Sequence, residues 1–363
     1  MSAAHHPISL HRAGRLKLHL QTRVERCRLQ GDARSEAEAR LRLSKVARQL
    51  RDPARALSEL SEALGLLLGE RAWLACADVL LTSAEFLFQL HKIEDCQQNL
   101  GEARRLYINH GDAVGLGLTE ILQADVHLLV GDVEAAFSSL LRSMDILTAI
   151  ALPGPLAHVW IQLARVHHRR QEHRAEDAAL SAAVEALTLY GKPRQAALCQ
   201  LQRAQRLRQR HAHTQALEAL QETQRRLGAA PPSPKIKVRV ALERGLLLED
   251  TGDDDGAERS LRRAAAGLAE VDEAALKADV VSALGAHLAR RAQERGQLSH
   301  VELCLGRAID ISISLQDPQR ILALAHILTE TARRLGDLEM ARRWTIRCSE
   351  AIEHLPPTDN KTH

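Results

Sequence analysis

Small and apolar residues recur along the chain at intervals of about forty positions, which predicts a repeat architecture. A column of small residues contains Ser44, Ala84, Ala124, Ala164, Ala204, Gly245, Gly285 and Thr329. A second column begins twelve residues later and contains Ala56, Cys96, Ala136, Glu176, Ala216, Ala257, Val301 and Ala341. A third column is almost entirely leucine and contains Leu60, Leu100, Leu140, Leu180, Leu220, Leu261, Leu305 and Thr345. The fourth column is small again and contains Ala63, Ala103, Ser143, Ala183, Thr223, Ala264, Ala308 and Cys348.

The spacing inside each repeat predicts two antiparallel helices. The last three columns are separated by four and then three residues, so they share one face of a helix. Small side chains allow two helix backbones to approach closely, and the leucines then fill the space between one hairpin and the next. We therefore expect an all-α fold, a solenoid of about eight antiparallel helix hairpins over residues 35–355.

Turn signals agree with these hairpins. Gly-Asp pairs precede the second column at three places, which are Gly131-Asp132, Gly252-Asp253 and Gly336-Asp337. Glycine in a left-handed conformation ends a helix, and aspartate caps the next one. Asp52-Pro53 has the same role in the first hairpin, since proline is tolerated in a first turn. Ser35 and Glu38 predict a capping box that opens the first helix of the array.

Three segments lie outside the regular repeats or interrupt them. Residues 1–34 form an N-terminal basic segment with a predicted helix near Ser9 to Leu29. Proline and alanine are concentrated around 228–235, which predicts a possible bend in the array. Residues 356–363 are expected to form a disordered tail.

Composition limits the classes of function. The formal net charge is only +3, which argues against nucleic acid as the main ligand. We find no N-terminal apolar run of signal-peptide length and expect no membrane span. The six cysteines form no CxxC pair and no metal-ligand spacing. They indicate small buried thiols in a reducing compartment, so we expect a cytoplasmic protein.

Motifs for catalysis are missing, so we expect no enzyme, no cofactor and no metal. The sequence has no phosphate-binding loop, GxSxG, HExxH or GxGxxG motif. His173 and His213 lie forty residues apart, at equivalent places on neighbouring repeats. They are consistent with a metal or proton-sensing cluster or with solvated turn residues, and the lack of a complete ligand set favours the second interpretation.

The columns resemble the tetratricopeptide repeat, whose helix hairpins carry small residues at equivalent places. Trp160, four residues before Ala164, falls where that family often has tryptophan, and Gly131 to Ala136 is similar to its inter-helix turn. The period of forty departs from the family's 34. Longer helices at this period resemble bacterial sensor domains of the maltose-activator type and scaffold subunits of large eukaryotic assemblies. The resemblance implies a right-handed superhelix with a concave groove that is lined by the first helix of each hairpin.

That geometry assigns groove residues by their place in the repeat. The residues after the small first-column positions are expected to face inward, and the first five are Lys45, Glu85, Asp125, Arg165 and Gln205. One turn further on, the groove would contain Phe88, His168 and Arg208. Arg169, which follows His168, would also contribute to it. Polar groups with apolar patches between them suit an extended peptide. The basic centre suggests an acidic partner segment across the fourth and fifth hairpins, unless these basic residues only oppose helix dipoles.

The leading hypothesis is therefore a scaffold or adaptor that binds a protein or peptide partner in its groove. The alternative is a ligand-sensing module of a signalling or transcription-control system. Self-association through an uncapped end is a third possibility, although the polar Thr345 in the leucine column indicates a cap there.

Overall fold

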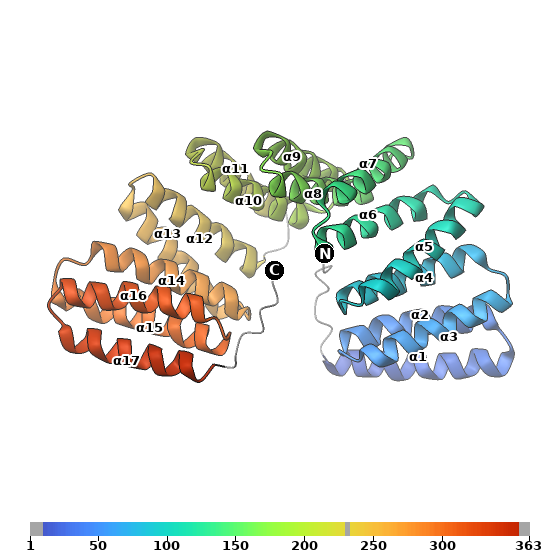
Figure 1. The fold of residues 1–363 in the computed structure, drawn as a ribbon, viewed down its shortest axis with the longest axis horizontal. Helices are drawn as coiled ribbons and strands as arrows, with labels where there is room; N and C mark the ends of the chain where they lie inside the picture. Colours follow the sequence, from blue (N-terminus) through green and yellow to red (C-terminus); the bar gives the residue numbers. More distant parts are fainter. Residues whose placement is uncertain (1–9, 229–232, 356–363) are drawn as a thin grey trace. The chain divides into compact units, whose positions relative to one another are not determined.

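The computed structural model describes residues 10–228 and 233–355, and every regular element in them is a helix. The chain divides into two compact units, Met1–Tyr190 (unit 1) and Gly191–His363 (unit 2), which are described separately. The helices of unit 1 are α1 (Leu10–Gln30), α2 (Ala33–Gln49), α3 (Pro53–Gly69), α4 (Trp73–Gln89), α5 (Ile93–His110), α6 (Ala113–Val130), α7 (Val133–Ala149), α8 (Pro153–Arg169) and α9 (His173–Leu189) (Figure 1).

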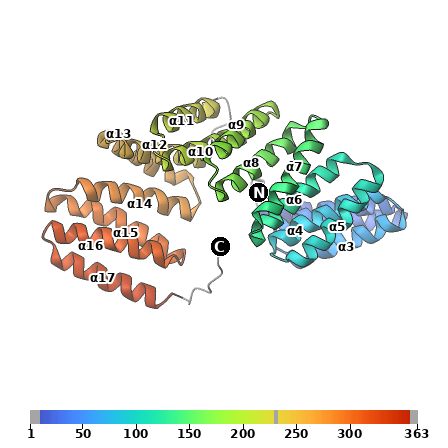
Figure 2. The same cartoon turned by 45° about the horizontal axis from the view of Figure 1, so that its top comes forward.

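Unit 2 continues with the same kind of element and can be followed by colour from green to red (Figure 2). Its helices are α10 (Pro193–Gln209), α11 (His213–Gly228), α12 (Pro234–Asp250), α13 (Asp254–Ala266), η1 (Gly267–Glu270), α14 (Ala274–Arg291), η2 (Arg295–Gln297), α15 (Leu298–Ser314), α16 (Pro318–Arg334) and α17 (Leu338–Glu353). The predicted all-α class is confirmed.

Sequential helices pack as hairpins, and the first helices of neighbouring hairpins also touch. In unit 1 the pairs are α2 with α3, α4 with α5, α6 with α7, and α8 with α9, while α1 packs on α2. In unit 2 they are α10 with α11, α12 with α13, α14 with α15, and α16 with α17. Contacts also join α4 to α6 to α8 in unit 1, and α10, α12, α14 and α16 in sequence in unit 2. The first helices thus form a layer of their own in each unit.

The repeating columns occupy the core, as the sequence predicted. All seven leucines of the third column are buried, whereas Thr345 at the end of the series is exposed. Ala124 and Ala164 of the first column lie with Leu140 and Leu180 in one hydrophobic cluster. Small residues and leucines from these two successive repeats therefore share one core, through which the α6–α7 hairpin packs on the α8–α9 hairpin.

Two glycines of the first column show why small residues are required there. A Cβ atom added to Gly245 would lie 2.7 Å from Cγ of Leu261, and one added to Gly285 would lie 2.6 Å from Cδ2 of Leu305. Distances this short are incompatible with van der Waals contact. The first helix of each hairpin therefore approaches the leucine of its own partner helix as closely as the backbone permits.

The turns between helices follow a stricter rule than the sequence revealed. From α2 to α11 the helices begin at positions 33, 53, 73, 93, 113, 133, 153, 173, 193 and 213. A residue with positive φ lies two positions before each start, at 31, 51, 71, 91, 111, 131, 151, 171, 191 and 211. Four of these are glycine, and the other six adopt the left-handed conformation despite carrying a Cβ. Each forty-residue hairpin therefore consists of two equal halves of twenty residues.

Most predicted helix caps are confirmed, and one is wrong. The side chains of Asp132, Asp253 and Asp337 each accept a backbone N–H of the following helix, after a glycine with positive φ. Asp52 caps α3, with Pro53 at its first position. The capping box predicted at Ser35 does not form, because Asp32 caps α2 and accepts the N–H of Ser35 at 3.0 Å. The aspartate is one turn earlier and captures the free N–H groups first.

Parts of the predicted domain organisation lie outside the described residues. These are the tail at 356–363, the start of the N-terminal segment and the centre of the possible bend at 228–235. Handedness of the superhelix stays a prediction that follows from the family resemblance.

The expectation that no segment approaches a membrane span needs a correction. Helix α6 is long and apolar enough to cross a membrane by length and composition. More than half of it is buried, and it contacts α4, α5, α7 and α8 within unit 1. Its packing against four helices accounts for its apolar character.

The close contact at Gly285 gives a stability prediction. Gly285→Ala should lower the free energy of unfolding by about 1–3 kcal/mol, because the new methyl group overlaps Leu305. Gly101→Ala in α5 is the control, since no atom lies within 4 Å of its added Cβ, and it should gain up to about 1 kcal/mol. Urea unfolding followed by circular dichroism measures both changes. A Gly285→Ala chain as stable as the parent would show that the two helices are not held at this distance.

Candidate functional site

The predicted groove residues all lie on first helices of hairpins, but they fall in both units. Unit 1 contains Lys45 on α2, Glu85 and Phe88 on α4, Asp125 on α6, and Arg165, His168 and Arg169 on α8. Unit 2 contains Gln205 and Arg208 on α10. Lys45, Glu85, Arg165 and Arg169 are exposed, and Phe88, His168, Gln205 and Arg208 are partly buried. Asp125 is instead buried, with 9% of its surface exposed.

Asp125 is covered by polar side chains of the next hairpin. Gln162 Nε2 donates to Asp125 Oδ1 at 2.5 Å, and Arg165 Nη1 lies 3.4 Å from the same oxygen. Arg165 Nη1 also donates to Gln162 Oε1 at 2.8 Å. Burial raises the pKa of the Asp125 carboxyl above its ordinary value, and the charge of Arg165 opposes that shift. Arg165 is thus a partner of Asp125.

The other predicted basic residues also bind groups of their own unit. His168 Nδ1 lies 3.3 Å from Oε1 of Glu176, a carboxylate that is 1% exposed and stands in a column of small residues. Arg169 Nη1 donates to the carbonyl oxygen of Leu128 at 2.6 Å, near the end of α6. A cation at the C-terminal end of a helix opposes its dipole, as the alternative interpretation of these residues predicted.

Arg208 in unit 2 is held by two carboxylates. Its Nε donates to Glu243 Oε1 at 2.5 Å and its Nη1 donates to Asp250 Oδ2 at 2.9 Å. Glu243 is buried on α12, so the pair joins two neighbouring first helices. Arg165, Arg169 and Arg208 therefore join neighbouring hairpins, and carboxylates of the same unit compensate the charges of Arg165 and Arg208.

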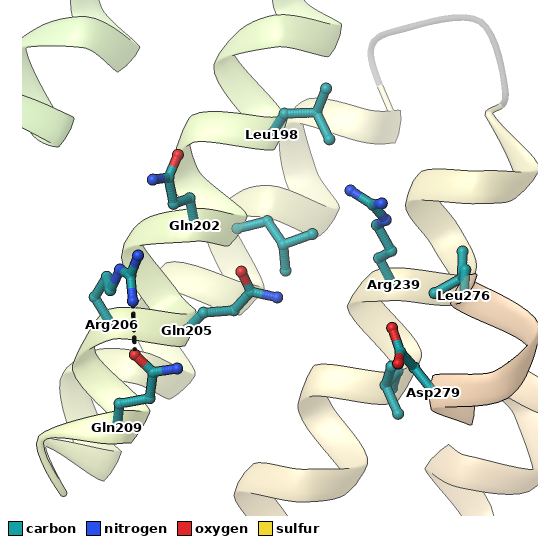
Figure 3. A pocket seen from close by; sticks show the side chains of 10 residues that line it. Leu198, Gln202, Gln205, Arg206, Gln209, Arg239, Leu276 and Asp279 are labelled. Carbon is teal, nitrogen blue, oxygen red and sulfur yellow. Dashed lines mark hydrogen bonds between the residues drawn. The ribbon is translucent and has the colours of Figure 1, made fainter. Parts of the chain in front are cut away.

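A different surface, on α10, α12 and α14 of unit 2, forms a groove of about 550 Å3. We call it the glutamine groove. Three amides, Gln202, Gln205 and Gln209, follow one face of α10 at spacings of three and four residues (Figure 3). Arg239 on α12 and Asp279 on α14 lie on the opposite side, and Arg206 lies beside the amides (Figure 3). Gln205 is the one sequence-predicted site residue that lines it.

Leucines form the apolar part of the glutamine groove. Leu201 and Leu276 are almost fully buried, with 2% and 3% of their surfaces exposed. Leu198 is 37% exposed, and Leu242 is partly buried. The groove thus combines apolar surface with a row of amides and both signs of charge. This is the usual composition of a site that binds a ligand in a defined orientation.

Arg239 and Asp279 of the glutamine groove form ion pairs with residues outside it. Arg239 Nη2 donates to Glu273 Oε1 at 3.1 Å, and Lys235 Nζ lies 2.7 Å from Glu273 Oε2. Burial alone would raise the pKa of Glu273, but the bonds and charges of Lys235 and Arg239 lower it. Asp279 Oδ1 lies 2.9 Å from Arg320 Nη2. These partners restrict the rotamers of Arg239 and Asp279 and leave further polar atoms of both groups for a ligand.

Four lining residues of the glutamine groove were not predicted from the sequence, namely Gln202, Gln209, Arg239 and Asp279. The recurrence of glutamine at 202, 205 and 209 was a usable signal, because it marks one face of a predicted helix. Arg239 and Asp279 lie forty residues apart and thus at equivalent places on neighbouring repeats. Within residues 10–228 and 233–355, no group of three or more His, Cys, Asp or Glu side chains could hold a metal ion.

Comparison with known proteins places the fold. No family model and no curated protein matches the sequence. Among solved structures, one match is a signal transduction ATPase with numerous domains (STAND) from Pyrococcus horikoshii that has a tetratricopeptide repeat sensor. Its TM-score is 0.69 at 13% identity, over 95% of this chain and 53% of that chain. The chain has the fold of a tetratricopeptide-repeat protein.

Two further solved structures share this tetratricopeptide-repeat fold. The apo form of the quorum sensor NprR from B. thuringiensis matches with a TM-score of 0.52 at 12% identity, over 85% of this chain and 99% of that chain. A Rap protein in complex with competence and sporulation factor matches with a TM-score of 0.50 at 14% identity, over 88% and 98%. The chain spans about half the length of the STAND ATPase.

Burial of Asp125 predicts a pH effect on stability. Because the pKa of Asp125 is raised in the folded state, its contribution to stability is fully present below the unfolded-state pKa and is lost as the pH rises through the folded-state pKa. Asp125→Asn retains an oxygen for Gln162 but removes the charge. The parent chain should therefore lose stability relative to Asp125→Asn as the pH is raised from acid to neutral.

Urea unfolding at a series of pH values measures this difference. Asp145→Asn, at an exposed position of α7, is the control and should show no such trend. A parent chain that instead gains stability over Asp125→Asn with rising pH would mean that Arg165 outweighs burial.

Proposed function

We propose that this chain is a non-enzymatic scaffold that holds an extended peptide segment of a partner protein in the glutamine groove. The observation that carries the proposal is the row of Gln202, Gln205 and Gln209 along an apolar floor, opposite Arg239 and Asp279. Each primary amide has both a donor and an acceptor, which are the two groups that a peptide backbone repeats. The oxygen of Gln209 already accepts from Arg206 Nη1 at 3.0 Å, so Gln202 and Gln205 are the two amides that offer both groups to the segment. Amides at helical spacing can therefore bind an extended main chain whatever its side chains are.

Specificity would come from the charged and apolar groups of the same groove. An acidic side chain of the bound segment would approach Arg239. One N–H group of Arg239 donates to Glu273, and its other N–H groups remain for the ligand. A basic side chain or the amino terminus of the segment would approach Asp279. This proposal retains an acidic feature in the partner but moves its contact from Arg165 and Arg208, which bind carboxylates of their own unit.

Two further observations support this assignment. The quorum sensor NprR and the Rap protein in complex with competence and sporulation factor share the fold. All six cysteines, each of them within the described residues, are free thiols, which favours a reducing cytoplasm as the place of binding.

A peptide selection tests the proposal. The probe is a phage-displayed library of random octapeptides, selected on the immobilised full chain, and the enriched peptides are synthesised with a fluorophore for anisotropy measurements. Replacing Gln202 and Gln205 together by alanine should weaken binding about tenfold, since each lost hydrogen bond costs about 0.5–1.5 kcal/mol. Arg239→Glu should shift the selected peptides from acidic to basic.

The matched control is the double replacement of Gln221 and Gln224 by alanine, two exposed glutamines on α11 of the same unit. It should leave affinity unchanged. If the selected peptides bind the Gln202/Gln205 variant and the control variant equally well, the glutamine groove is not their site and the proposal is wrong.

A sensor module is the second candidate, favoured by the structural likeness to a STAND ATPase whose tetratricopeptide repeats form a sensor. A sensor must transmit binding to other parts of the chain, whereas a scaffold need only hold its partner. Hydrogen exchange with a selected peptide separates the two. Protection confined to α10, α12 and α14 favours the scaffold, and changes that reach α16 and α17 favour the sensor.

A further inference from the structure

Helix α13 is shorter than the other second helices of the described hairpins. It has 13 residues and continues into the four-residue 3-10 helix η1, whereas α3, α5, α7, α9, α11, α15 and α17 have 16 to 18 residues. The change occurs at Gly267, where an added Cβ would lie 2.6 Å from Cγ2 of Val238 on α12. Leu268 and Val271 then enter the core. The chain is therefore drawn toward α12 at the point where a regular helix would continue.

A pocket of about 420 Å3 lies beside this shortened end, between α13 with η1, the first half of α14, and α15. We call it the α13–α15 pocket. Alanines at 265, 266 and 269 leave space on the α13 side, and Leu268, Val281 and Leu284 provide buried apolar surface. Leu303 on α15 completes the lining and is 69% exposed. An exposed leucine next to buried apolar side chains gains from any apolar ligand that covers it.

Two cations belong to the same pocket. Lys277 on α14 lies 4.0 Å from Oδ1 of Asp272, a fully solvated carboxylate, so this ion pair is weak. Arg307 on α15 is exposed and forms no ion pair with any residue that the structure describes. Arg262, which is close enough to affect Cys304, is already bound to Glu258 at 2.8 Å. The pocket thus has a positive charge that its own lining does not compensate.

We propose that the α13–α15 pocket binds a small amphiphilic carboxylate of the medium-chain fatty acid class. Its alkyl chain would cover Leu268, Leu284 and Leu303, and its carboxylate would lie near Lys277 and Arg307. An apolar ligand without charge would leave Arg307 without an ion pair and Lys277 with only its weak pair to Asp272, and a cationic ligand would be repelled. The volume lies within the range of small-molecule sites, which favours a small ligand over a protein segment. The pocket shares no residue with the glutamine groove, so this inference does not rest on the proposed function.

Cys304 provides a direct readout of occupancy. It lines the pocket and is partly exposed, whereas the other five cysteines are buried. Burial raises the pKa of its thiol, and Arg262 and Arg307 oppose the shift, so labelling is best run at alkaline pH. The probe is decanoate, and modification of Cys304 by N-ethylmaleimide is followed by mass spectrometry of the intact full chain.

At concentrations below its critical micelle concentration, decanoate should slow the labelling of Cys304 at least fivefold. Decanol should slow it far less. Lys277→Gln and Arg307→Gln should each raise the decanoate concentration for half-protection about tenfold. Arg259→Gln, at an exposed position of α13 outside the pocket, is the control and should change nothing. Ala266→Trp, at another exposed position, should fill the pocket and abolish protection while circular dichroism stays unchanged.

Equal protection by decanoate and decanol would overturn the carboxylate assignment. Two outcomes would overturn the site itself. In the first, decanoate leaves the labelling rate of Cys304 unchanged in the parent chain. In the second, Lys277→Gln and Arg307→Gln leave the decanoate concentration for half-protection unchanged, as Arg259→Gln is expected to do. Peptide binding to the glutamine groove is measured separately, and none of these outcomes changes its interpretation.

Discussion

The constraint on which the structure depends is the left-handed residue in each inter-helix turn. From α2 to α11 this residue recurs at every twentieth position, so each helix has nearly the same length. Equal helices keep the columns in register along the array, and small first-column residues such as Gly245 and Gly285 let the leucine of the partner helix pack directly against the backbone. At six of these ten turns the residue is not glycine, so packing of the helices on both sides must outweigh the local cost of about 1–2 kcal/mol.

The fold could be predicted from sequence because its determinants are local and repeated. Leu100, Leu140 and Leu180 alone indicate a period, and each Gly-Asp pair marks a turn. The half-period of twenty was hidden, since residues such as Arg71 and His91 carry no mark of the conformation they adopt. Ser35 was misassigned as a cap because Asp32, one turn earlier, competes for the same N–H groups.

The candidate site was harder to predict because neighbouring repeats bring equivalent positions together. Asp125 and Arg165 are forty residues apart and were both assigned to an open groove, yet this spacing is what makes them an ion pair. Whether a charged side chain is available to a ligand therefore depends on the residue forty positions away, with which it can form an ion pair. The glutamines at 202, 205 and 209 lie on one helix and escape this problem, because amides carry no charge that an adjacent repeat must compensate. Arg239 and Asp279 are ordered by pairs that only the folded chain reveals.

The equal halves of each hairpin also determine how such a chain can change in length. Loss of residues 72–111 would join Arg71 to Asp112, a left-handed turn residue to a helix cap, and leave both layers intact. Loss of only residues 52–71 would join Arg51 to Ala72, again a left-handed residue to the N-cap position of a helix, although Ala72 provides no side-chain cap. This loss would move Trp73–Gln89 into the layer of second helices, where α3 buries Leu60. We therefore expect this array to gain or lose whole hairpins of forty residues. The turn geometry alone would also permit a change of twenty residues, but the packing of the two layers would not.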